Sequence, residues 1–355
     1  MPRPIRRPPA KAPPVAPDRV RGALFGLSSG DALGVPVDGR RLQAPPFPAL
    51  VRGAHAEMVG GGRHALKPGQ VTSLTQSACC LSESLRAQRG YDLADAVRRY
   101  VEWLPVGVDV EPPVTEAMTA LKGQYADPRT IAKTLWLKSN RKAASNVSLV
   151  RTAPLGLFLA TEAAARRRAS LEDSAITHFD PRCQLACVAL NEALATAVQG
   201  PKAPEPKRWV HAAESAIAVA SAELAQNLGE FLPEIQAARA SLLEDLRLAQ
   251  SDDPLLYGPE LHVWAQANAV RVTFRLAFWT LFHAPDVETG LVDVVNRGGN
   301  ACANAAVAGA LLGARDGEAA IPERWRTALL EALSFRAQGP LWNVYRPRIL
   351  LELAS

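Results

Sequence analysis

Carboxylates and one histidine gather at points of the chain where a loop is expected to run into a helix. Asp31 and Asp38 belong to the segment GDALGVPVD, which is rich in turn-forming residues and follows the first expected helix. His178 and Asp180 belong to THFDPRC and directly precede Pro181, a residue that favours the first position of a helix. Side chains of these types can exchange protons with a substrate. A helix cap is the alternative interpretation of His178 and Asp180.

Two further loops could bind an anion through backbone N–H groups. The segment SNVSLVR, residues 145–151, leads into an expected helix, and amides at such a junction can bind a diphosphate. The segment NRGGNACAN, residues 296–304, brings Gly298 and Gly299 to the start of another helix, where a simple turn is the alternative. Each motif alone is common, whereas their order along the chain is specific.

In this order, the motifs resemble the ADP-ribosylglycohydrolase family, which includes the dinitrogenase reductase-activating glycohydrolases. The resemblance covers about residues 19–335. The matching blocks are GALFGLSSGDALGVPVD (22–38), PGQVTSLTQSACCLSESL (68–85), SNVSLVRTAPLGLF (145–158), THFDPRCQLACVALNEAL (177–194) and NRGGNACANAAVAGALLGARDG (296–317). The resemblance implies an all-α protein that forms a single compact orthogonal helical bundle of the ADP-ribosylglycohydrolase type.

The chain departs from this family at the residues that bind metal. Family members hold two Mg²⁺ or Mn²⁺ ions, and such ions need oxygen ligands, including carboxylates. The corresponding positions here carry Thr72, Ser73, Leu74, Asn300, Cys302 and Ala303. Ser73, Leu74, Asn300 and Cys302 replace aspartates, and Ala303 replaces a threonine. Because three of the four aspartate replacements are uncharged and the fourth is a soft thiol, we expect no metal cofactor.

The resemblance also assigns candidate ligand-binding residues. Asp38 stands where the family has a glutamate that can bind a metal or assist proton transfer, and it is the candidate catalytic residue. The candidate ligand-binding residues are Asp31, Ser145, Asn146, Arg151, His178, Asp180, Gly298 and Gly299. Val147 replaces a glycine in the loop expected to face the phosphates, at a point where the backbone needs to approach the ligand.

Two functions remain open at this stage. The first is a pseudoenzyme with a binding, regulatory or structural role, either a sensor of ADP-ribose or a related nucleotide or a protein that binds only other proteins. The second is an active hydrolase that cleaves the N-glycosidic bond of an ADP-ribosylated protein or a related derivative. Asp31, Asp38 and Asp180 would then form a rearranged site. The absence of the metal-binding aspartates favours the pseudoenzyme.

Helical periodicity extends over most of the chain and predicts one domain, residues 18–355. Apolar residues at positions i, i+3, i+4 and i+7 predict a first helix capped by Asp18. Further helices are predicted over 74–89, 92–104, 128–139, 154–168, 181–198, 207–226, 229–249, 260–283, 287–296, 301–314 and 322–336. Loops rich in proline and glycine are predicted at 45–48, 60–69, 111–113 and 200–207. The alanine-rich stretch 305–314 predicts close packing of helices.

The net charge of +5 belongs to the N-terminus. The first 21 residues hold six basic side chains and one acidic side chain, so the remaining chain is neutral. This distribution argues against a specific nucleic-acid surface on the folded domain. Residues 1–17 are also rich in proline, and we expect a disordered basic tail that is a candidate site for a protein partner.

Cysteine usage and hydropathy indicate the cellular setting. The five cysteines have no CxxC spacing, which favours buried thiols over disulfides or a zinc site built from His178, Cys183, Cys187 and Cys302. No run of 18 apolar residues is present, and no apolar segment follows the N-terminal arginines. We therefore expect a cytoplasmic protein, and the abundance of alanine and arginine suggests a bacterial source.

Overall fold

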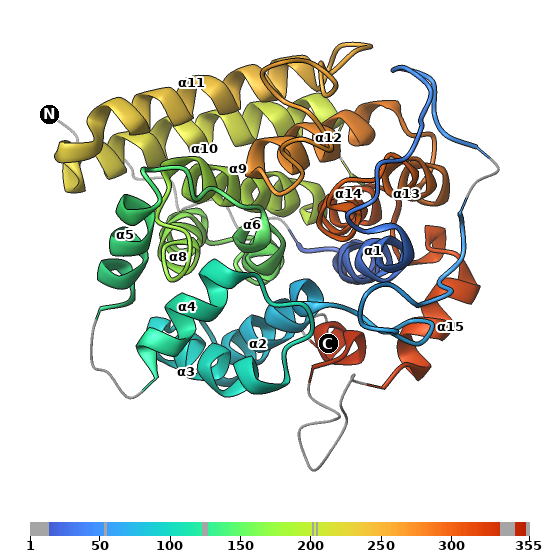
Figure 1. The fold of residues 1–355 in the computed structure, drawn as a ribbon, viewed down its shortest axis with the longest axis horizontal. Helices are drawn as coiled ribbons and strands as arrows, with labels where there is room; N and C mark the ends of the chain where they lie inside the picture. Colours follow the sequence, from blue (N-terminus) through green and yellow to red (C-terminus); the bar gives the residue numbers. More distant parts are fainter. Residues whose placement is uncertain are drawn as a thin grey trace, which may run out of the picture.

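The fold is known from a computed structural model of the 355-residue chain, which describes residues 14–52, 55–122, 127–200, 202–203, 205–333 and 345–352. Within these ranges the chain forms helices and loops with isolated β-bridges and no strand, which confirms the all-α prediction (Figure 1). The α-helices are α1 (Pro17–Gly34), α2 (Ser73–Gln88), α3 (Leu93–Trp103), α4 (Pro112–Leu121), α5 (Pro128–Lys138), α6 (Val147–Arg151), α7 (Ala153–Phe158), α8 (Ala163–Ser174), α9 (Pro181–Val198), α10 (Pro206–Asn227), α11 (Leu232–Leu248), α12 (Val270–His283), α13 (Val287–Asn296), α14 (Ala301–Asp316), α15 (Glu323–Glu331) and α16 (Pro347–Leu351). Short 3₁₀ turns are η1 (Val35–Val37), η2 (Leu104–Val106), η3 (Gly229–Phe231) and η4 (Glu318–Ala320).

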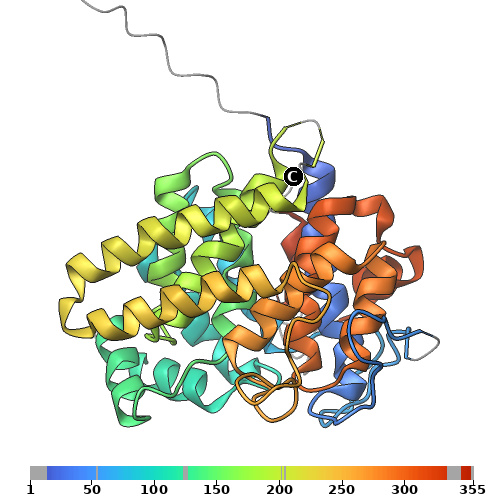
Figure 2. The same ribbon diagram turned by 90° about the horizontal axis from the view of Figure 1, so that it is seen from above.

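Helices α1 and α14 lie side by side in the interior, where both are seen end-on in Figure 1. The long helices α10 and α11 border the bundle on one side, and α2, α3 and α4 border it on another (Figure 1). The loops between α1 and α2 and between α11 and α12 emerge on the same face of the molecule (Figure 2). The candidate site lies at this face, so segments far apart in sequence build it together.

A column of glycines brings α1 and α14 into backbone contact. Gly22, Gly26, Gly30 and Gly34 recur every four residues and therefore share one face of α1. A Cβ on Gly26 would lie 2.0 Å from the carbonyl oxygen of Gly309 on α14, and the other three glycines are equally confined. The predicted close packing of residues 305–314 is confirmed. The column fixes the end of α1 against the beginning of α14.

Several predicted helix boundaries are wrong for identifiable reasons. The predicted helix 260–283 begins only at Val270, because Trp264 packs outside any helix and its indole N–H donates to the carbonyl oxygen of Arg297 at 2.8 Å. The predicted helix 154–168 is divided between α7 and α8. Helix α4 begins at Pro112, where a loop was predicted, because prolines are accommodated at the first positions of a helix. Part of the predicted helix 322–336 lies outside the described residues.

The start of α1 differs from the prediction. Ala16 is the N-cap residue and makes no side-chain cap, so Asp18 does not cap the helix. The Asp18 carboxylate instead accepts the N–H of Glu318 at 3.2 Å, because α14 and η4 pack beside the first turn. Residues 14–16 also hydrogen-bond the segment 198–200, so the end of the predicted disordered tail 1–17 is ordered. Residues 1–13 lie outside the described part of the chain.

The five cysteines are free and buried, as predicted. The described residues contain no group of three histidine, cysteine or acidic side chains that could hold a metal ion, and the zinc alternative therefore gains no support. No helix among the described ranges has the length and hydrophobicity needed to cross a bilayer. The predicted loop 200–207 lies between α9 and α10, and its last two residues already belong to α10. Residues 201 and 204 lie outside the described part of the chain.

Candidate functional site

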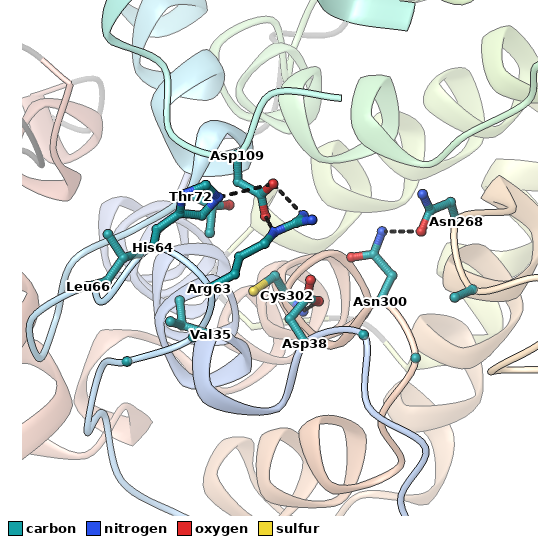
Figure 3. A pocket seen from close by; sticks show the side chains of 15 residues that line it. Val35, Asp38, Arg63, His64, Leu66, Thr72, Asp109, Asn268, Asn300 and Cys302 are labelled. Atoms are coloured by element: carbon teal, nitrogen blue, oxygen red, sulfur yellow. Dashed lines mark hydrogen bonds and ion pairs between the residues drawn. The ribbon is translucent and has the colours of Figure 1, made fainter. Parts of the chain in front are cut away.

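A pocket of about 260 Å³ opens at the face where the loops emerge. Its wall combines the end of α1, the loop at 60–66, the segment before α4 and the beginnings of α2 and α14. The lining residues are Val35, Asp38, Gly39, Gly61, Gly62, Arg63, His64, Leu66, Thr72, Asp109, Ala267, Asn268, Gly299, Asn300 and Cys302 (Figure 3). The pocket thus brings Asp38 together with three of the six positions where the family binds metal.

Asp31 lies beneath this pocket and connects three helices. Its carboxylate accepts the backbone N–H groups of Thr72 and Thr75, each at 3.1 Å, and their hydroxyls at 2.8 and 2.7 Å. The thiol of Cys302 also hydrogen-bonds Asp31. Burial raises the pKa of Asp31, and the four threonine donors oppose that rise. We refer to Asp31, Thr72, Thr75 and Cys302 as the floor; it holds the beginnings of α2 and α14 against α1.

Ser73 and Leu74 follow Thr72 and contribute to packing. The Ser73 hydroxyl donates to the carbonyl oxygen of Asp109 at 2.9 Å, and the Ser73 N–H donates to that of Val108 at 2.6 Å. Leu74 is buried in the hydrophobic core. Ser73 therefore holds the segment that carries Asp109, and Leu74 has no donor atom to offer.

At the beginning of α14, the three residues at family metal-binding positions contact neighbouring protein groups or pack in the interior. Asn300 caps the helix through its side-chain oxygen, and its amide donates to Asn268 at 3.1 Å and to Asn146 at 3.3 Å. The N–H of Cys302 donates to Asp38 at 3.1 Å. Burial raises the pKa of the Cys302 thiol well above its usual value, which keeps the thiol protonated. Ala303 is buried and has no side-chain donor.

Arg63 and Asp109 face each other across the opening of the pocket (Figure 3). The Arg63 Nε donates to Asp109 at 3.0 Å, and a second nitrogen of the same guanidinium pairs with the other carboxylate oxygen. The His64 Nε2 lies 3.4 Å from Asp109. We refer to Asp38, Arg63, His64 and Asp109 as the mouth. Its two carboxylates and the Arg63 guanidinium lie within a single small pocket.

Both partners of this ion pair are presented by unusual backbone. Arg63 lies in a tight turn that is closed by reciprocal hydrogen bonds of 2.7 and 2.8 Å between Gly61 and Leu66. Gly61 and Gly62 have φ of +92° and +65°, which glycine adopts without strain. Asp109 has φ of +62°, a conformation that most residues avoid and aspartate tolerates. These backbone conformations place the side chains of Arg63 and Asp109 opposite each other.

Asp38 is the mouth carboxylate with an altered affinity for protons. Burial raises the pKa of Asp38 to about 6, and the charge of Asp109 contributes in the same direction. The Cys302 N–H and Arg63 oppose the rise. Asp38 therefore changes charge within a physiologically accessible range, which a proton donor or a pH-dependent acceptor requires.

A second cavity of about 540 Å³ adjoins the first, since Ala267 and Asn268 line both. Its wall also contains Glu111, Lys142, Ser145, Arg182 and Trp264. The structure thus places Ser145 in this neighbouring cavity and Asp38 in the pocket. Asn268 marks the boundary between them.

A chain of hydrogen bonds runs from Arg151 through Thr177, His178 and Ser145 to Glu111. The distances are 2.9 Å from Arg151 to Thr177, and 2.7 Å both from Thr177 to His178 and from His178 to Ser145. The Ser145 hydroxyl bonds Glu111. Arginine only donates and a carboxylate only accepts, so this chain assigns the His178 Nε2 as the protonated nitrogen. Burial, assisted by Arg151, lowers the pKa of His178 to about 3, and the imidazole is neutral.

The remaining candidate residues have packing partners that the sequence did not reveal. Arg151 is buried in an ion pair with Asp173 at 2.8 Å, and it lines neither of the two cavities. Asp180 caps α9 and accepts bonds from Arg182 and from the Trp136 indole, which matches the cap interpretation. The structure does not bring Asp180 into the pocket, so Asp31, Asp38 and Asp180 do not share one site there.

Asn146 and the glycine pair are also held in place. The Asn146 amide donates to Thr273 at 2.8 Å in the interior. Gly298 and Gly299 have φ near +70°, and a Cβ on Gly298 would lie 2.2 Å from the carbonyl oxygen of Arg40. Both glycines therefore form a turn, and Gly299 also lines the pocket.

Sequence reasoning missed Arg63, Asp109 and Glu111. They lie in loops outside the motifs, and no local pattern of residues marks them as partners. Arg63 and Asp109 meet because the turn at 60–66 packs on η1 and the segment before α4 is bonded to the beginning of α2. The only available signal was the GGGRH sequence, since a run of glycines before charged residues often marks a tightly folded loop.

The donor set at this site does not match a pair of divalent cations. Such ions need several oxygen ligands, with carboxylates that offset their charge. Ser73 and Asn300 are neutral and already bonded, Leu74 has no donor, and the Cys302 thiol is protonated. The Arg63 guanidinium adds a fixed positive charge at the same pocket. These side chains do not fit the two-metal centre of the family.

The fold and the site together define a class: an all-helical bundle with a polar pocket between the beginnings of two helices. The family model of ADP-ribosylglycohydrolase matches residues 12–349, and the chain belongs to that family. It is similar to the ADP-ribosyl-[dinitrogen reductase] glycohydrolase of Rhodospirillum rubrum, with 27% identity over 89% of this chain and 92% of that protein. It is also similar to the ADP-ribosylarginine hydrolase Tri1 of Pseudomonas putida (strain GB-1), with 24% identity over 88% of this chain and 74% of that protein. A solved structure described as an ADP-ribosylglycohydrolase-related protein complex has a TM-score of 0.67, with 26% identity and coverage of 95% of this chain and 96% of that one.

Proposed function

We propose that this protein is a pseudoenzyme that binds ADP-ribose or a closely related nucleotide without a divalent metal. The proposal rests on the four positions where the family has metal-binding aspartates. Ser73 holds the Asp109 segment, Leu74 joins the core, Asn300 caps α14 and Cys302 completes the floor. Each side chain has a role in the scaffold, and none offers a charged oxygen to a metal.

The two adjoining cavities support an elongated ligand. The pocket and the second cavity measure about 260 and 540 Å³ and share the wall formed by Ala267 and Asn268. Together they fall within the range of volumes that bind cofactor-sized molecules. A ribose ring in the pocket would leave the larger cavity for the rest of a nucleotide.

The second cavity has the chemistry for the anionic and aromatic parts of such a ligand. Lys142 and Arg182 line it, and Lys142 can pair with phosphate oxygens, whereas Arg182 already binds Asp180 through two nitrogens. Trp264 lines the same cavity and offers an aromatic surface on which a base can stack. The pocket, with Asp38 and Asp109, is suited to neutral hydroxyl groups, because carboxylates accept hydrogen bonds from them.

The hydrogen-bond chain that ends at Glu111 supports binding over nucleophilic catalysis. The Ser145 hydroxyl donates a hydrogen bond to Glu111, so the neutral His178 donates a hydrogen bond to the Ser145 oxygen. In this arrangement His178 cannot accept the serine proton. A serine in that state is not an activated nucleophile. Ser145 and His178 therefore position Glu111 at the wall of the second cavity.

Calorimetry with ADP-ribose tests the proposal. Titration in the presence of a chelator and again with excess Mg²⁺ should give the same dissociation constant, because no metal contributes to the site. Trp264→Ala should weaken binding, whereas Val219→Ala, at an exposed position of α10, should not. Binding that requires Mg²⁺, or no binding at all, would contradict the proposal. A parallel assay should detect no release of ADP-ribose from ADP-ribosylated arginine with Mg²⁺ or Mn²⁺.

One observation favours the alternative of an active hydrolase. Asp38 has a pKa of about 6 and is in electrostatic contact with the second carboxylate Asp109, and a carboxylic acid with such a pKa can serve as a proton donor near neutral pH. In that case turnover should persist in a chelator and disappear in Asp38→Ala. Turnover that Asp38→Ala leaves unchanged would remove this alternative.

A protein partner of the N-terminal tail remains a separate proposal. The described residues refine where the tail should be cut, since residues 14–16 bond the segment 198–200 and Arg19 donates to Ala197 at 2.9 Å. Removing residues 1–13 leaves all of these bonds in place, whereas removing residues 1–17 eliminates those of residues 14–16 and the first residue of α1. The shorter deletion should abolish association with a partner at unchanged thermal stability, and the longer deletion should lower the melting temperature.

A further inference from the structure

The guanidinium of Arg63 binds Asp109, one of the two carboxylates of the mouth. It binds Asp109 through two nitrogens, and its electrostatic neighbours also include Asp38 and Cys302. The close-up shows Arg63 extending between Asp109 on one side and Asp38 and Cys302 on the other (Figure 3). A planar group with several N–H donors is thus already bound to one carboxylate of this pocket and lies near the other.

The position of Arg63 is built into the loop. The turn at 60–66 is closed by two hydrogen bonds, and a Cβ on Gly62 would lie 2.7 Å from the carbonyl oxygen of Val35. The turn therefore packs directly on η1, which precedes Asp38. On the other side, Ser73 bonds the backbone of Asp109 and fixes its segment. The backbone on both sides is therefore fixed by these contacts, and the ion pair with Asp109 holds the Arg63 side chain across the opening.

An ADP-ribosylated arginine carries a guanidinium on the anomeric carbon of its ribose. Such a cation needs carboxylate acceptors at the point where the ribose ends, and in this pocket these acceptors are Asp38 and Asp109. Arg63 already uses Asp109, and two guanidinium groups in one small pocket repel each other. Free ADP-ribose has a neutral hydroxyl on the same carbon and meets no such conflict.

We propose that Arg63 mimics the arginine of an ADP-ribosylated protein and makes the pocket selective for free ADP-ribose. This inference rests on the proposed function, and it names Arg63 as a residue that determines specificity. The protein then binds ADP-ribose after ADP-ribose has been released from a modified protein. It does not bind ADP-ribose that is still attached to an arginine side chain.

The test compares ligands and variants by calorimetry in the presence of a chelator. The ligands are ADP-ribose and a short peptide that contains ADP-ribosylated arginine. Wild-type protein should prefer ADP-ribose by at least about tenfold, and Arg63→Ala should reduce this preference to below about threefold. Arg41→Ala removes the same charge from an exposed residue that does not line the pocket, and it should leave the preference unchanged. An equal preference in wild type and Arg63→Ala would overturn the inference.

Methylguanidinium gives a second readout that does not depend on the nucleotide. It should bind Arg63→Ala and raise its melting temperature, because Asp109 is then free to accept it, and it should not bind wild type or Arg63→Ala combined with Asp109→Asn. The two proposals fail in different ways. If no variant binds ADP-ribose, the proposed function and the selectivity both fail, and methylguanidinium then reports only on the guanidinium subsite. If ADP-ribose binds but neither readout responds to Arg63→Ala, only the inference fails.

Discussion

The floor and the mouth of the pocket contain carboxylates only seven residues apart, and the two regions use them differently. Asp31 in the floor is fully buried and accepts hydrogen bonds from two threonines and a cysteine on two other helices. Asp38 in the mouth is partly exposed and has one backbone donor. Burial raises the pKa of both residues, but only Asp38 faces a cavity. A shifted pKa therefore indicates a functional carboxylate only when the surroundings leave room for a ligand.

The largest effect should come from removing the floor carboxylate. Asp31→Ala leaves four threonine donors without their acceptor, and buried unsatisfied donors are costly, so we expect a loss of about 4 kcal/mol in the free energy of unfolding. Chemical denaturation measures this loss. Asp38→Ala is the matched control and should cost less than about 1 kcal/mol, because a ligand-accessible carboxylate can be replaced by water. Equal losses would remove the distinction between floor and mouth.

The next effect comes from restoring the family aspartates. The fourfold variant Ser73→Asp, Leu74→Asp, Asn300→Asp and Cys302→Asp places new carboxylates beside Asp31, and mutual repulsion should lower the melting temperature in a chelator. Mn²⁺ should recover part of that loss, because carboxylates can then bind it. Thermal melts with and without Mn²⁺ measure both effects. A response of the wild-type protein to Mn²⁺ would contradict the assignment of these four side chains to the scaffold.

A smaller effect should appear in the pH dependence of stability. The pKa of Asp38 is about 6 in the folded protein and about 3.9 in an unfolded chain. Since the folded state holds this proton more tightly, its contribution to stability is complete below about pH 4 and is lost as the pH rises to about 6. Asp38→Asn removes this dependence, so the difference between wild type and variant should change by on the order of 1 kcal/mol across that interval. Parallel stability curves would show that Asp38 titrates normally.

The smallest effect should come from the mouth ion pair. Arg63 is about two-thirds exposed, with 69% of its side chain accessible, and exposed ion pairs contribute little to stability. Arg63→Ala should therefore change the free energy of unfolding by less than about 0.5 kcal/mol, as measured by urea denaturation. A loss above about 2 kcal/mol would mean that the turn at 60–66 depends on the ion pair, and the mouth would then be structural like the floor.

The sequence predicted the helical fold because periodicity and ordered motifs are local properties. It also predicted where α14 begins. It placed the end of the first helix too early, because Asp31 lies within α1 and not in a loop after it. The contrast between Asp31 and Asp38 could not be predicted, since it depends on which residues surround each carboxylate. Arg63 and Asp109 were missed for a related reason: they lie 46 residues apart and meet only through tertiary packing, of the turn at 60–66 on η1 and of the Asp109 segment on Ser73. The boundary of α12 was wrong because Trp264 makes a tertiary contact that periodicity does not reveal.

The glycine column between α1 and α14 has a consequence for protein synthesis. More than 260 residues separate the two helices, so the ribosome must synthesise all of them before the two backbones can meet. Until then, the glycine face of α1 lacks its partner. The pocket is therefore completed late: a nascent chain that ends before α14 contains all four mouth residues but lacks Cys302 of the floor and the N–H that Cys302 donates to Asp38.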